Sequence, residues 1–269
     1  MNIHTTTHAG KKLRVEWAER NLAAHRDDLL AYGYPKELTE TSISVDEKSF
    51  YLDGPCKSAD YCRWITGDRK PTMEVRTGKG GRVNLVMGVH LGGILTPMEL
   101  PTTRQRPGER TASENYEYFL LLARRELQDT GYDRVQVIYE DNCKIHTGKK
   151  HDAVKLDCDR GGFASILLPP YSPDMNPIEK FFGILTKKVY KGGRDAYRTK
   201  DELMAAIQGA VDEMNFRKVG KPSEATIVFN SLMGAQGELW RELVDVQGCA
   251  IPATKEATRR FATNEVSLR

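Results

Sequence analysis

The sequence lacks the features of disulfide-rich secreted proteins, of zinc-knuckle proteins and of membrane proteins. Its five cysteines are an odd number and contain no Cys-x-x-Cys pair, which argues against a disulfide framework and against a zinc knuckle. No apolar run approaches the roughly 20 residues that a membrane helix requires. Residues 1–10 are polar and lack the apolar core of a signal peptide. We therefore expect an intracellular protein in a reducing compartment, without a membrane partner.

The net charge of +3 is too small to indicate a polyanionic partner, but its distribution is uneven. Residues 57–82 contain seven basic and three acidic side chains, and residues 180–200 contain seven basic side chains and one acid. Local positive charge of this kind suits a nucleic-acid backbone, although a solvated helix face remains the alternative for each segment. The basic residues that we single out as DNA contacts are Arg63, Arg69, Lys70, Lys180, Lys187 and Lys188.

Hydrophobic periodicity predicts a mixed sheet with helices packed on it, in the α/β class. The pair Gly92-Gly93 predicts a hairpin turn between the second and third strands. We expect strands at 41–52, 82–91, 94–100, 135–141 and 164–168, and helices at 13–30, 113–129, 149–160, 176–190, 200–216 and 223–247. Residues 250–269 are polar, and we expect them to be mobile.

Two acids lie at the ends of expected elements, one at the end of a strand and the other at the start of a helix. Asp141 closes a strand with apolar residues on both faces, and Glu179 is the third residue of a helix for which Asn176 suits the N-cap and Pro177 the first position. Four prolines stiffen the loop before that helix. Carboxylates delivered in this way can hold hard divalent cations. Each acid also has an ordinary alternative. Asp141 could form a turn with Asn142, and Glu179 could close a capping box or favour the helix dipole.

A third acid is expected from the first strand. Asp46 faces away from the apolar Ile43 and Val45, whereas Glu47 points to the opposite face, so that only one of the two acids can serve. The alternative for Asp46 is a solvent-facing carboxylate. His146 either supports the acids or contacts DNA, or it is an ordinary turn histidine.

Together these segments resemble a known family. Residues 46–50, Asp141 with Asn142 and His146, and residues 168–179 (Leu-Pro-Pro-Tyr-Ser-Pro-Asp-Met-Asn-Pro-Ile-Glu) resemble the three acidic motifs of the mariner-type DDE transposases and of related bacterial insertion-sequence transposases. The third motif is long and specific. The resemblance covers roughly residues 12–217.

The resemblance implies a ribonuclease-H-like fold, with a mixed five-stranded sheet whose first three strands are antiparallel and which helices flank. Asp46, Asp141 and Glu179 would bind two Mg²⁺ ions, for which Mn²⁺ can substitute, and would catalyse DNA strand cleavage and strand transfer. Asn142, His146 and Asn176 would support these acids or contact DNA. The expected partner is double-stranded DNA, as transposon ends and target, bound by a homodimer or higher assembly. The expected compartment is the nucleus in a eukaryote, or the cytoplasm or nucleoid in a bacterium.

The expected organisation is a helical lead-in over 1–40, a catalytic domain over 41–217 with a basic excursion at 57–82, and a C-terminal helix and polar tail over 218–269. Members of this family usually have about a hundred residues of helix-turn-helix DNA-binding domain before the first acid. Asp46 comes too early for that, so we expect a catalytic domain without its sequence reader. The alternative function is a non-catalytic, host-adopted DNA-binding or assembly protein. An RNase H or resolvase is disfavoured by the proline-rich third motif.

Overall fold

The computed structural model describes residues 8–52, 81–101, 112–142, 163–170, 172–192 and 197–245. The helix expected at 149–160 and the tail expected at 250–269 lie outside these residues. The helices are α2 (His8–Ala24), α3 (Arg26–Tyr32), α4 (Lys36–Thr41), α5 (Ala112–Asp129), the 3₁₀ helix η2 (Pro173–Met175), α7 (Pro177–Val189), α8 (Lys200–Asn215), α9 (Glu224–Gly234) and α10 (Gln236–Asp245). The strands are β1 (Ser42–Tyr51), β2 (Arg82–His90), β3 (Gly93–Ile94), β4 (Met98–Leu100), β5 (Val137–Glu140) and β6 (Ala164–Leu167).

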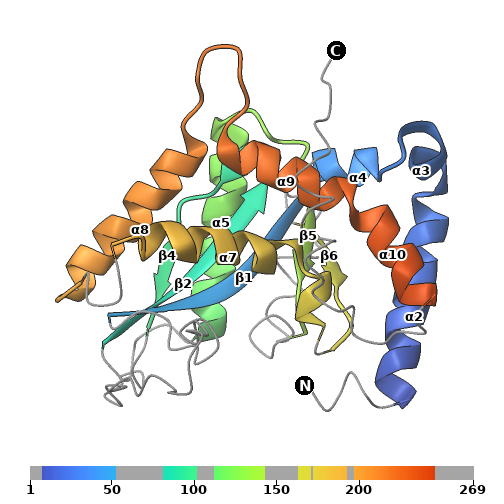
Figure 1. Cartoon of the computed structure of the whole chain (residues 1–269), viewed down its shortest axis with the longest axis horizontal. Coiled ribbons are helices and arrows are strands. Elements are labelled where there is room, and N and C mark those ends of the chain that lie inside the picture. Colours follow the sequence, from blue (N-terminus) through green and yellow to red (C-terminus); the bar gives the residue numbers. More distant parts are fainter. Residues whose placement is uncertain are drawn as a thin grey trace, which may run out of the picture.

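Strand β1 lies at the centre of a mixed sheet with the order β3-β2-β1-β5-β6 (Figure 1). It pairs antiparallel with β2 along its whole length and parallel with β5, and β5 pairs parallel with β6. The short strands β3 and β4 both pair antiparallel with β2. The α/β class and the antiparallel start of the sheet are therefore confirmed.

The expected third strand is divided into β3 and β4, because Thr96 and Pro97 do not take part in strand pairing. Pro97 has no N–H to donate to a ladder, and the preceding Thr96 N–H turns away to the Glu126 carboxylate, at 3.2 and 3.1 Å from its two oxygens. The hairpin turn is Leu91-Gly92 and not Gly92-Gly93, because His90 pairs with Gly93. Gly93 itself has φ +134°, a conformation that L side chains rarely adopt.

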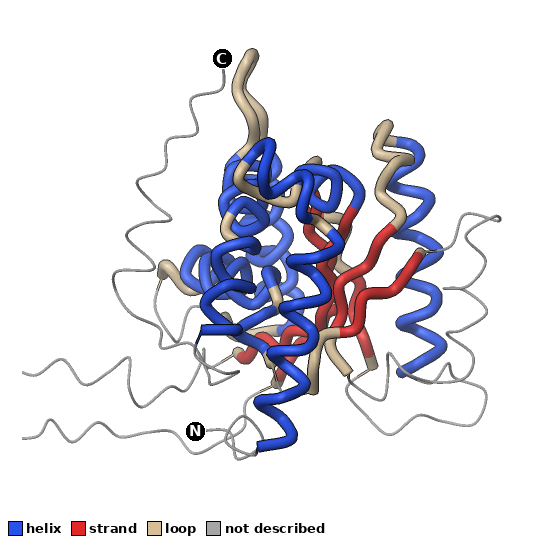
Figure 2. Tube along the Cα trace, turned by 90° about the vertical axis from the view of Figure 1, so that its right-hand side faces the viewer, coloured by secondary structure: helices blue, strands red, loops and turns tan. Residues whose placement is uncertain are grey.

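Each face of the sheet packs against its own set of helices (Figure 2). One face packs on α5, and this layer includes Ile43, Val45 and Ile138 from the strands with Tyr116 and Phe119 from the helix. The opposite face packs on α7, with α8, α9 and the N-terminal helix α2 joining the same cluster. Period-2 alternation along β1 explains the division, since alternate side chains point to opposite faces.

The main hydrophobic cluster includes residues from the expected lead-in (1–40), the expected catalytic domain (41–217) and the expected C-terminal segment (218–269). Trp17 of α2 packs edge-on against Trp240 of α10, with ring centroids 6.2 Å apart, and both are buried with Phe229 of α9. The boundaries at 40 and 217 stay a prediction of the sequence.

Two of the expected helices are each divided in two. The helix expected over 13–30 is α2 and α3, and the helix expected over 223–247 is α9 and α10 with a break at Ala235. Just after that break, α10 approaches α3 so closely that a Cβ added at Gly237 would lie 2.4 Å from Leu29 Cδ2.

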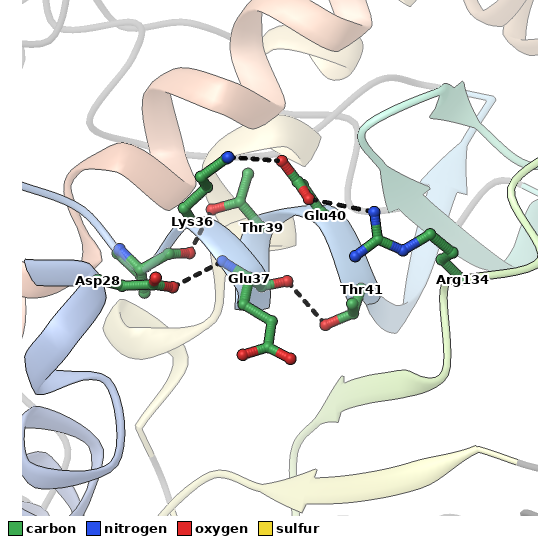
Figure 3. Close-up of polar contacts among 8 residues, drawn as sticks. Asp28, Lys36, Glu37, Thr39, Glu40, Thr41 and Arg134 are labelled. Atoms are coloured by element: carbon green, nitrogen blue, oxygen red, sulfur yellow. Dashed lines mark hydrogen bonds and ion pairs between the residues drawn. The ribbon is translucent and has the colours of Figure 1, made fainter. Parts of the chain in front are cut away.

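A polar network fixes the entry into β1 (Figure 3). Asp28 accepts a hydrogen bond from the Glu37 N–H at 2.7 Å and so stabilises the start of α4. Glu40 pairs with Lys36 at 3.8 Å and with Arg134 at 3.5 Å. Arg134 precedes β5, so the Glu40–Arg134 pair links the segment before β1 to the segment before β5. Asp46 lies within β1, and Asp141 directly follows β5.

Candidate active site

Asp46 lies in the middle of β1, on the face that packs against α7. It is 9% exposed. Its Oδ1 accepts a hydrogen bond from the Glu47 N–H at 2.7 Å, and its Oδ2 accepts one from Asn176 Nδ2 at 3.2 Å. Ser44, two residues earlier on the same face, donates its hydroxyl to Asn176 Oδ1 at 2.7 Å. The alternative of a solvent-facing carboxylate is therefore wrong for Asp46.

Asn176 joins this strand to the helix on which Glu179 lies. Its backbone is extended, and its Oδ1 also accepts the Ile178 N–H at 3.4 Å, so it is the N-cap of α7, as the sequence predicts, with Pro177 at the first helical position. The Asn176 N–H bonds to the Pro173 carbonyl at 3.1 Å. That amide therefore already has a backbone acceptor within η2. The buried side of α7 fixes the direction in which this first turn points.

Asp141 directly follows β5 and is partly exposed. Its neighbour Asn142 donates from Nδ2 to the Leu168 carbonyl at 2.9 Å, which ties the end of β5 to the start of the proline-rich loop. The preceding Glu140 points to the other face of the sheet and is fully buried. There it accepts hydrogen bonds from the Tyr116 hydroxyl at 2.6 Å and from the Ser165 hydroxyl at 2.5 Å.

The three acids share one electrostatic neighbourhood. Burial, followed by the negative charges of Glu47, Asp141 and Glu179, raises the pKa of Asp46 to about 7, and the Glu47 N–H opposes this rise. Within the described residues, no three His, Cys, Asp or Glu side chains are close enough to one another to form a complete metal cage. The charges of Asp141, after the end of β5, and of Glu179, in the first turn of α7, thus both act on Asp46 of β1.

The predicted basic contacts differ in their surroundings. Lys180 and Lys187 lie at exposed positions of α7. Lys188 pairs with Glu213 at 2.8 Å and with Glu224 at 2.9 Å, so its positive charge is compensated within the protein. Arg63, Arg69, Lys70 and His146 lie outside the described residues.

Sequence reasoning missed several residues that support the acids. Ser44, Glu140 and Tyr116 were not singled out, nor was Arg14, whose guanidinium binds Asp174 in the proline-rich loop. Alternation along β5 could have indicated that Glu140 turns away from Asp141 into the α5 layer. The partners from α2 and α5 lie 24 to 160 residues away in the sequence, and no local spacing signals them.

Comparison with known proteins decides the family. Residues 42–204, more than half of the chain, match the family described as DDE superfamily endonuclease. The chain belongs to this DDE family. It is 25% identical over 203 residues to the transposable element Tc3 transposase of Caenorhabditis elegans, an alignment that covers 74% of this chain and 53% of the relative.

Solved structures show that the DDE chain has the mariner transposase catalytic fold. The Mos1 mariner paired-end complex with Mn superposes with a TM-score of 0.67 at 16% identity, over 91% of this chain and 64% of the Mos1 chain. The catalytic domain of Mos1 mariner transposase superposes with a TM-score of 0.62 at 14% identity, over 91% of this chain and 97% of that domain. The ribonuclease-H-like prediction is confirmed.

The DDE chain spans about half the length of its curated relative. Among the helices of the described residues, none is both long and apolar enough to cross a membrane.

Proposed function

We propose that this chain is a transposase catalytic domain that cleaves DNA strands and joins them to target DNA, with Asp46, Asp141 and Glu179 as its catalytic acids. What supports the proposal is that Asp46, Asp141 and Glu179 come from three distant segments and that the charges of Asp141 and Glu179 both act on Asp46. The bond from Asn176 to Asp46, at 3.2 Å, connects two of the three motifs directly.

The donor set fits divalent cations. Carboxylate oxygens are the ligands that Mg²⁺ and Mn²⁺ prefer, and the charged side chains that act on Asp46 among the described residues are carboxylates that repel it. The similar Mos1 paired-end complex contains Mn. We propose that Asp46, Asp141 and Glu179 hold two Mg²⁺ ions, with Mn²⁺ as a substitute. Such ions activate the attacking oxygen and stabilise the leaving oxygen in phosphoryl transfer.

The residues of the chain orient these acids. Asn176 Nδ2 binds one oxygen of Asp46 and the Glu47 N–H binds the other, so both carboxylate oxygens are held before any ligand arrives. Glu179 lies at the amino end of α7, where the helix dipole favours a carboxylate. Holding the groups in this way removes much of the entropic cost of reaching the reactive geometry.

We propose double-stranded DNA as the partner, both as transposon ends and as target. The exposed Lys180 and Lys187 follow Glu179 on α7 and would bind phosphates beside the acids. Arg63, Arg69 and Lys70 remain proposed contacts, as do supporting roles for Asn142 and His146. Lys188 remains a proposed contact of smaller weight, because its charge is shared with Glu213 and Glu224. The paired-end state of the Mos1 complex suggests that this chain also acts as a homodimer or higher assembly on DNA.

The test is a nicking and strand-transfer assay on supercoiled plasmid with Mg²⁺ or Mn²⁺. We expect Asp46→Asn, Asp141→Asn and Glu179→Gln each to lose nearly all cleavage while keeping DNA affinity. Asp212→Asn, on an exposed position of α8, is the matched control and should cleave like the wild type. A wild type that binds DNA but cleaves no faster than the three acid variants would refute the enzyme and favour a non-catalytic DNA-binding protein.

A further inference from the structure

The N-terminal helix α2 holds both ends of the proline-rich loop. Trp17 Nε1 donates to the Leu167 carbonyl at 3.0 Å, at the end of β6 where the loop begins. Arg14 binds Asp174 near the other end of the loop, with Nη1–Oδ1 at 2.9 Å and Nη2–Oδ2 at 2.5 Å. Arg14 and Trp17 are three residues apart and therefore lie on the same face of the helix.

The Arg14 contact is a partly buried, bidentate pair. The Arg14 side chain is 1% exposed, and its Nε has no hydrogen-bond partner in the structure. Removing a guanidinium from water is costly unless a carboxylate compensates for it. The planar fork of arginine fixes the orientation of a carboxylate as well as its distance. Asp174 is thus held in one position and one orientation.

Short backbone bonds connect Asp174 to the acids. Asp174 is the middle residue of η2, in which the Met175 N–H bonds to the Ser172 carbonyl at 3.0 Å and the Asn176 N–H bonds to the Pro173 carbonyl at 3.1 Å. Asn176 in turn binds Asp46, as described above, and its carbonyl accepts the Glu179 N–H at 3.2 Å. A displacement of η2 is therefore transmitted to Asn176 and from there to two of the acids.

We propose that Arg14 is a positioning residue for the acidic site, acting through Asp174 to fix Asn176 and, with it, Asp46 and Glu179. Arg14 lies outside the segment that matches the family, residues 42–204. The inference deepens the proposed function and rests on it, since it assigns Arg14 to the geometry of the proposed cation site.

The test compares four single variants and one double variant of the whole chain. Arg14→Met removes the charge at similar length, Arg14→Lys keeps the charge without the fork, and Asp174→Asn weakens the pair from the other side. Leu22→Ala is the matched control, because Leu22 packs against the same core from the same helix but its apolar side chain cannot hydrogen-bond to the loop. The measurements are Mn²⁺ affinity by electron paramagnetic resonance, DNA affinity, single-turnover cleavage and urea unfolding.

We expect Arg14→Met and Asp174→Asn to weaken Mn²⁺ affinity and to slow cleavage by about 10–100-fold, the effect usual for residues that orient metal ligands. DNA affinity should stay within about two-fold, since no base or phosphate contact is removed. Arg14→Lys should be intermediate. The Arg14→Met/Asp174→Asn double variant should be no worse than the poorer single variant, because both changes break one interaction. Leu22→Ala should lose stability alone.

The inference is overturned if Arg14→Met and Asp174→Asn bind Mn²⁺ like the wild type, or if Leu22→Ala loses as much Mn²⁺ affinity as they do. If Arg14→Met does not fold, Arg14→Lys and Asp174→Asn decide by the same readouts. A wild type that binds Mn²⁺ but does not cleave DNA refutes the proposed enzyme. The Mn²⁺ affinities of the variants, compared with that of the wild type, still test the role of Arg14. A wild type that does not bind Mn²⁺ refutes both.

Discussion

Asn176 should determine both the stability of the site and its activity, and two substitutions separate these roles. Asn176→Ala removes the cap of α7, the acceptor for Ser44 and the donor to Asp46. Asn176→Ser keeps a hydroxyl that can cap α7, but this shorter side chain reaches neither Ser44 nor Asp46. Any difference between the two variants therefore reports the cap.

The magnitudes follow from the three contacts. Loss of the cap costs about 1 kcal/mol. The Ser44 hydroxyl is buried, and leaving it without an acceptor costs about 1–2 kcal/mol. Asp46 keeps its bond from the Glu47 N–H, so the lost donor adds at most about 1 kcal/mol. We expect Asn176→Ala to lower the free energy of unfolding by about 3 kcal/mol and Asn176→Ser by about 2 kcal/mol.

Urea unfolding at pH 7.5 measures the free energy, and single-turnover plasmid nicking measures the activity. Both variants should nick about 100-fold more slowly than the wild type, since each lacks the bond that orients Asp46. Wild-type nicking by Asn176→Ser would refute the reasoning, because the cap alone would then suffice. A cost below about 1 kcal/mol for Asn176→Ala would show that the buried bonds are not formed.

Three further changes test other parts of the molecule. Burial lowers the pKa of His90 to about 4 from 6.5, so the unfolded chain binds a proton first as the pH falls. His90 alone should lower the free energy of unfolding by about 2 kcal/mol from pH 7.5 to pH 5. Protonation of Asp46, whose pKa is raised to about 7, stabilises the folded chain over the same range. The His90 effect is therefore read as a difference: the wild type should lose about 2 kcal/mol relative to His90→Gln between pH 7.5 and pH 5 in urea unfolding. Tyr116→Phe removes a donor from the buried Glu140 and should lower the free energy of unfolding by about 2 kcal/mol, whereas an unchanged unfolding midpoint would contradict that bond. In salt-dependent DNA binding, Lys187→Ala should reduce the slope of log affinity against log salt by about 1. Lys188→Ala should change the slope less, and equal slopes would refute the pairing argument.

Local patterns were enough to predict the main elements of the fold. Alternating apolar residues predicted β1, and Asn176 followed by Pro177 predicted the start of α7 correctly. The alternation also assigned Asp46 and Glu47 to opposite faces. These features depend on neighbours within a few residues, which the sequence displays directly.

Contacts between distant segments could not be predicted in the same way. The pair between Arg14 and Asp174 and the bond from Tyr116 to Glu140 join separate helices to the sheet, and no spacing encodes them. The division of the third strand at Pro97 was missed because its hydrophobic pattern continues across the break. The three acids were chosen through the family resemblance, since each one alone has an ordinary alternative.

The participation of α2, α9 and α10 in the main core has a practical consequence for trimming the chain. A version cut to residues 42–204, the part that matches the family, would lack Trp17 and Trp240 and would expose the apolar side of Tyr139 and its neighbours to water. Such a fragment would contain every proposed acid and yet tend to aggregate. Expression boundaries for this protein should therefore include both α2 and α10.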